Sequence, residues 1–95
     1  MDAESLTEHS GTAILARVIA PEKPTFSADT ARSILSLNFT EPDHARMNEL
    51  ASKARAGTLS ALEHEELDSF LLVGHLLDLM HSKARVSLRK FSSKA

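Results

Sequence analysis

Residues 60–80, which read SALEHEELDSFLLVGHLLDLM, decide the fold. Ser60 and Glu63 form the S-x-x-E pattern of a capping box, in which each side chain binds a backbone N–H group of the other residue. No proline follows residue 60, and basic residues gather towards the end of the chain, where they complement a helix dipole. The pattern predicts one helix over about residues 60–90, roughly 45 Å long at 1.5 Å per residue.

The centre of this helix is apolar on nearly every side. Eight of the eleven residues in 70–80 are large and apolar, and a helix of this kind must be buried all round. The short helices of a small chain offer incomplete cover, so we expect a homodimer or another protein partner. The residues that we expect at this interface are Leu67, Phe70, Leu71, Val73, Gly74, Leu77 and Met80. The alternative is that the upstream helices cover both faces within a monomer.

Two shorter helices are expected upstream, over residues 28–37 and 42–55. Ser27 and Thr40 each precede an apolar periodic segment and suit the N-cap position. Gly57 suits the left-handed residue that ends a helix. Glu49 and Lys53 are four residues apart and predict an ion pair along the second of these helices. The fold class is therefore all-α, with short helices packed on one long C-terminal helix.

The N-terminal residues 1–25 are expected to form a flexible or partner-binding segment, followed by a helical domain over 26–95. The first ten residues are predicted to be mobile. Ile14, Leu15, Val18 and Ile19 would form one apolar face of a short helix, although their β-branched side chains also suit a strand. Pro21 and Pro24 end this segment. These four apolar residues are candidates for binding a partner.

The composition limits the classes of protein to which the chain belongs. Its 95 residues allow one small domain, and the 42% of hydrophobic residues are enough for a folded core. The absence of cysteine excludes a disulfide framework, a thiol nucleophile and a zinc site built on cysteines. The first ten residues hold no Lys or Arg and resemble no secretory signal. The longest apolar stretch is too short and too polar for a membrane span, so we expect a cytoplasmic protein.

The chemical motifs of enzymes do not occur in this sequence. After His64 and Glu65 no second histidine follows at the spacing of the HExxH metalloprotease pattern. The acidic cluster Glu63, Glu65, Glu66 and Asp68 is explained by the positive end of the helix dipole. The three glycines are far apart and form no phosphate loop. We therefore expect no enzymatic activity, no cofactor and no metal site.

Basic residues near the C-terminus are the one electrostatic feature that suggests a ligand. The residues concerned are Lys83, Arg85, Arg89 and Lys90. They could contact an anion or nucleic acid, although they also suit the negative end of the helix dipole. The net charge of −2 for the whole chain argues against nucleic-acid binding as its main property. A small dimeric nucleic-acid-binding protein is the alternative function.

Three short sequences carry a resemblance to known proteins. They are RMNELA at residues 46–51, GTL at 57–59 and SKAR at 82–85. Over about residues 30–90 the chain resembles a group of small uncharacterised bacterial proteins with this pattern, which are often encoded beside an HNH- or PIN-type nuclease. The resemblance implies an antitoxin- or immunity-like partner of such a nuclease. It supplies no catalytic or binding residues, and the function expected is that of a non-catalytic protein–protein interaction module.

Overall fold

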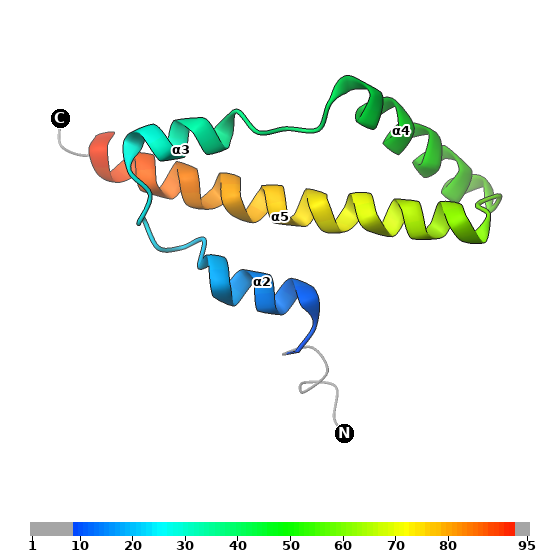
Figure 1. Ribbon diagram of the computed structural model, residues 1–95, viewed down its shortest axis with the longest axis horizontal. Coiled ribbons are helices and arrows are strands. Elements are labelled where there is room, and N and C mark those ends of the chain that lie inside the picture. The colour runs from blue at the N-terminus through cyan, green and yellow to red at the C-terminus, as the bar shows by residue number, and fades with distance from the viewer. Residues whose placement is uncertain (1–8, 93–95) are drawn as a thin grey trace. The chain divides into compact units, whose positions relative to one another are not determined.

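The computed structural model describes residues 9–92, and this part of the chain contains four α-helices and no strand (Figure 1). The helices are α2 (Gly11–Ile19), α3 (Ala28–Leu35), α4 (Glu41–Ala56) and α5 (Ala61–Ser92). The predicted all-α class is confirmed, and so is the long C-terminal helix that contacts the other helices. The dimer expected from the sequence stays a prediction.

Each helix begins at a side-chain cap, and the caps of α3, α4 and α5 are the residues that the sequence predicts. The capping box at the start of α5 is complete, because Ser60 N–H donates to Glu63 Oε1 at 3.0 Å and Glu63 N–H donates to Ser60 Oγ at 3.1 Å. Three further hydroxyls accept the backbone N–H group three residues ahead: Ser10 from Ala13, Ser27 from Thr30 and Thr40 from Asp43. Each cap satisfies a donor that the first turn of a helix leaves without a partner.

Two helices end at residues with left-handed backbone conformation. Gly57 has φ +72° and closes α4, as its position in the sequence predicts. Ala20 has φ +50° at the end of α2, although its Cβ makes this conformation unfavourable. Of the helix and the strand left open for residues 14–19, the helix is the one that forms. Helix α3 ends at Leu35, two residues earlier than predicted, because the N–H group of Leu37 turns back to Ile34 O at 3.0 Å.

The chain divides into two compact units. The hairpin unit is Asn38–Gly74. The terminal unit joins the residues up to Leu37 with those from His75 onward, and α5 runs through both. The predicted division into residues 1–25 and 26–95 stays a prediction. Residues 1–8, which include most of the stretch expected to be mobile, lie outside the described residues.

In the hairpin unit, α4 packs antiparallel on the first half of α5. Leu50 of α4 is fully buried. The ring of Phe39 meets the ring of Phe70 edge-on, with 5.9 Å between centroids. A Cβ atom added at Gly74 would lie 3.8 Å from the Phe39 ring, an ordinary contact distance. The group that faces Gly74 is thus an aromatic ring of the same chain.

In the terminal unit, α3 lies beside the second half of α5 (Figure 1), and the fully buried side chains of this unit are small. Ala31, Ala84 and Ser87 have no exposed surface. Small residues at a contact let two helix axes approach closely. His81 Nε2 lies 2.8 Å from Leu37 O and so ties the end of α3 to α5.

Candidate interaction surfaces

Large apolar side chains remain exposed on α5 within the hairpin unit. Leu71, Leu72 and Val73 are 60%, 49% and 44% exposed. Successive helical residues point about 100° apart, so these three span roughly 200° of the circumference. Helix α4 therefore covers one side of α5 and leaves the others open. Leu62, near the start of α5, is 77% exposed.

The predicted interface residues on α5 divide between exposed and covered positions. Leu71 and Val73 are exposed, whereas the others are half-buried: Leu67, Phe70, Gly74, Leu77 and Met80. The structure tests no interface with another chain, so this set stays a prediction. Leu72 and Leu76 are exposed but were not predicted, because their exposure depends on which side of α5 the other helices take.

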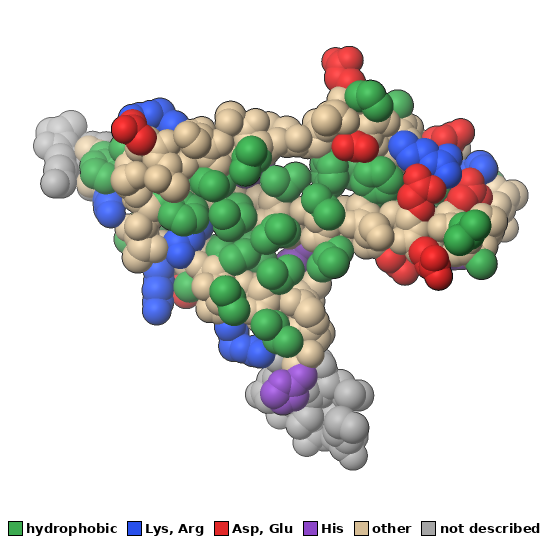
Figure 2. All heavy atoms as spheres, in the orientation of Figure 1, with side chains coloured by type: hydrophobic (Ala, Val, Ile, Leu, Met, Phe, Trp, Pro, Cys, Tyr) green, Lys and Arg blue, Asp and Glu red, His purple; other side chains and the backbone are tan. Residues whose placement is uncertain are grey.

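Helix α2 has one broad apolar face, and none of its residues is fully buried. Leu15 and Ile19 are half-buried, whereas Ile14 and Val18 are 43% and 76% exposed. Arg17 is also exposed. Figure 2 shows hydrophobic side chains at the surface of α2. Of the four residues predicted to bind a partner, two thus lie on the half-buried side of this face and two on its exposed side.

Three polar residues of α5 hold the backbone of the connection between α2 and α3. Lys83 Nζ donates to Ile19 O at 2.6 Å, and Lys90 Nζ donates to Pro24 O at 2.8 Å. Between them, the fully buried Ser87 Oγ accepts from Phe26 N–H at 3.1 Å. Positions 83, 87 and 90 follow the i, i+4, i+7 spacing of one helix face. We call these three residues the linker clamp.

The linker clamp changes the interpretation of the predicted anion contacts. The ammonium groups of Lys83 and Lys90 bind carbonyl oxygens of their own chain, and Lys83 Nζ also lies 5.0 Å from the centroid of the Phe26 ring. Arg85 and Arg89 are exposed. Two of the four residues predicted to contact nucleic acid thus have a structural role, and nucleic-acid binding stays a prediction that depends mainly on the two arginines.

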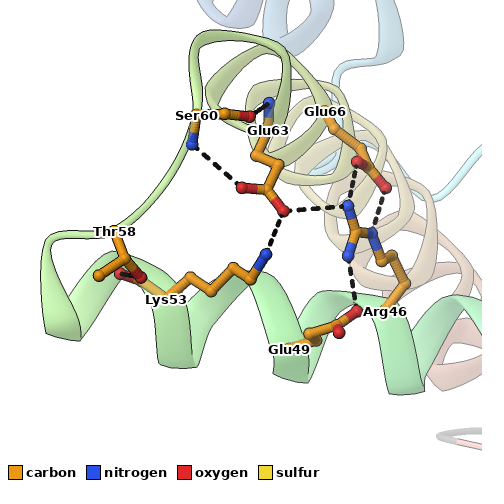
Figure 3. Close-up of polar contacts among 7 residues, drawn as sticks. All are labelled: Arg46, Glu49, Lys53, Thr58, Ser60, Glu63 and Glu66. Atoms are coloured by element: carbon orange, nitrogen blue, oxygen red, sulfur yellow. Dashed lines mark hydrogen bonds and ion pairs between the residues drawn. The ribbon is translucent and has the colours of Figure 1, made fainter.

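Charged side chains join α4 to α5 at the turn end of the hairpin (Figure 3). Arg46 forms a two-pronged pair with Glu66, with distances of 2.7 and 2.8 Å, and also contacts Glu49 at 2.6 Å. Lys53 Nζ donates to Glu63 Oε2 at 2.6 Å. The predicted pair of Glu49 with Lys53 is wrong, because each of these residues has a different partner. We call these five residues the hairpin ion cluster.

The hairpin ion cluster favours the charged form of each member whose pKa departs from its usual value. Lys53 and the N–H group of Ser60 lower the pKa of Glu63 to about 2. Hydrogen bonds from Arg46 lower the pKa of Glu66, and the same pairing with Glu66 and Glu49 raises the pKa of Arg46. A carboxylate with a low pKa is a poor proton acceptor near neutral pH. Two of the four acids assigned to the helix dipole thus also link α4 to α5, a role that sequence spacing alone does not show.

The described residues form neither a metal site nor a helix that could span a membrane. Within residues 9–92, no group of three or more histidine or acidic residues is placed to hold a metal ion. No helix in the same range combines the length and the apolar character that crossing a membrane requires. Comparison with models of protein families, with curated proteins and with solved structures gives no match for this chain. The exposed surfaces on α2 and α5 are the candidate functional sites among the described residues.

Proposed function

We propose that this chain is a non-catalytic protein–protein interaction module. The observation that supports the proposal is the run of exposed apolar residues Leu71, Leu72 and Val73 on α5. Contiguous exposed apolar surface on a small protein is typical of an interaction site, because its burial is favourable by about 25 cal/mol per Å². A partner that covers this part of α5 would complete the burial that α4 provides on one side only.

The proposed partners are a second copy of the chain and a nuclease encoded beside it. The homodimer follows from the incompletely covered α5. The nuclease follows from the resemblance carried by residues 46–51, 57–59 and 82–85, which implies an antitoxin- or immunity-like role.

Light scattering on the purified full chain, alone and mixed with the neighbouring nuclease, tests this proposal. We expect a dimer alone and a larger complex in the mixture. Leu72→Glu should reduce both associations, because it places a charge in the apolar surface. Ser52→Glu is the matched control, since Ser52 is exposed on α4 outside that surface. A monomer that forms no complex with the nuclease would overturn the proposal.

A further inference from the structure

We infer that α2 of one copy docks on the hairpin unit of a second copy, with Arg17 facing Asp68 of that copy. The apolar pair Ile14 and Val18 would then cover Leu72. This inference rests on the proposed homodimer and deepens it, because it names the segments that meet. It also assigns the outer face of α2 to the second copy of the chain and not to the nuclease.

The docking element is the outer face of α2. Ile14, Arg17 and Val18 are spaced i, i+3 and i+4, so they share one side of the helix. All three are exposed, and Val18 is 76% exposed. The adjacent side of the helix packs within its own chain, where Leu15 and Ile19 are half-buried. Helix α2 therefore presents a surface that is both apolar and cationic.

The receiving surface lies on the first half of α5. Glu65, Asp68 and Leu72 are spaced i, i+3 and i+7, so they share one helix face, and all three are exposed. At 1.5 Å per residue, the nine residues of α2 span roughly 13 Å and the eight residues 65–72 span roughly 12 Å. The two surfaces match in length and are opposite in charge.

Charge favours this pairing over other segments of a second copy. The hairpin unit, residues 38–74, has seven acidic and three basic residues and so a net charge of −4. Its Arg46 and Lys53 are already paired with acids of the hairpin ion cluster. The other cations near the C-terminus fit the hairpin unit less well. Lys83 and Lys90 already bind carbonyl oxygens in the linker clamp. Arg85 and Arg89 share their helix face with the polar residues Asp78 and Ser82, so this face offers no apolar surface to cover Leu72.

The symmetry of a dimer would double this contact. Because α2 and the hairpin unit are different surfaces, a single contact is heterologous. In a dimer with two-fold symmetry each copy donates one α2 and receives the other, so two identical contacts form. Any substitution in α2 or on α5 would then act twice in each dimer.

A charge-reversal cycle, measured as the dimer dissociation constant by analytical ultracentrifugation, tests the inference. Arg17→Glu and Asp68→Arg should each raise the dissociation constant by roughly tenfold or more, because like charges then face each other. The double variant should return it to within roughly threefold of the wild type. Arg89→Glu and Asp78→Arg are the matched controls, since both residues are exposed outside the contact. Val18→Ser should weaken the dimer without any change of charge.

The outcomes separate this inference from the proposal on which it rests. A wild-type dimer that neither charge reversal weakens would overturn the inference and leave the homodimer standing. Two weakened single variants without rescue in the double variant would also overturn it. A wild-type chain that stays monomeric at every concentration measured would overturn both the inference and the homodimer.

Discussion

Lys53 Nζ lies 2.6 Å from Glu63 Oε2, which joins the last turn of α4 to the first turn of α5. The other carboxylate oxygen of Glu63 accepts the N–H group of Ser60 at 3.0 Å. One carboxylate therefore caps the start of α5 and links it to α4. Because the Lys53 ammonium and the Ser60 N–H group both bind the charged carboxylate more strongly than the neutral acid, the stability of the hairpin unit depends on the ionisation of Glu63.

This dependence predicts how Glu63→Gln changes the response of the protein to pH. The folded state lowers the pKa of Glu63 from 4.5 to about 2, so the charged side chain stabilises the fold above pH 4.5. That contribution should decrease as the pH falls from 4.5 towards about 2. Urea denaturation of both proteins from neutral pH down to about pH 2 should show the wild type more stable at neutral pH, with the difference in stability narrowing below pH 4.5.

The control for this experiment is Glu65→Gln, which removes an exposed acid two residues further along α5. It should leave the stability profile close to that of the wild type. A stability difference between wild type and Glu63→Gln that is constant across the whole range would contradict the assignment of these contacts to the charged carboxylate.

Leu50→Ala should be the most damaging conservative substitution in the hairpin unit. Leu50 is fully buried, and removing a buried leucine side chain costs about 2–5 kcal/mol through lost burial and the cavity that remains. Leu62→Ala, at a residue that is 77% exposed, should change the free energy of unfolding of the monomer by less than about 0.5 kcal/mol. Equal effects of the two substitutions in urea denaturation would show that Leu50 is not in the core.

Local signals in the sequence predicted the helices well. The capping box of Ser60 and Glu63 and the left-handed Gly57 depend on residues within one or two turns, so their spacing is sufficient to find them. The same holds for the N-cap residues Ser27 and Thr40. These signals predicted where α3, α4 and α5 begin, and Gly57 and Pro21 predicted where α4 and α2 end.

Contacts between helices were beyond what spacing could predict. Arg46 has acids near it on its own helix and, twenty residues away, on α5, and only packing shows that Glu66 receives two of its hydrogen bonds. Lys83 resembled a free cation in the sequence, but it binds the carbonyl of Ile19, sixty-four residues away. Which apolar residues of α5 stay exposed also depends on the side that α4 covers.

Substitutions at the two residues with left-handed backbone conformation, Gly57 and Ala20, should have opposite effects on the stability of the fold. Gly57→Ala places a Cβ at φ +72° and should cost about 1 kcal/mol, although no neighbouring atom would be in its way. Ala20→Gly relieves the same conformation at φ +50° but makes the unfolded chain more flexible, so it should be neutral or stabilise by up to about 0.5 kcal/mol. Thermal unfolding followed by circular dichroism measures both, and a clear loss of stability in Ala20→Gly would contradict this account.

The basic residues of α5 should separate into a structural and an exposed class when they are replaced one at a time. Lys83→Met removes the donor to Ile19 O while keeping an apolar side chain of similar length. Because the linker clamp holds residues 19–26, amide hydrogen exchange at Phe26 should become roughly three- to tenfold faster. Arg85→Met, two residues further along α5 and exposed, should leave that rate unchanged. Equal exchange rates in the two variants would mean that Lys83 does not hold the linker and is available to bind an anion.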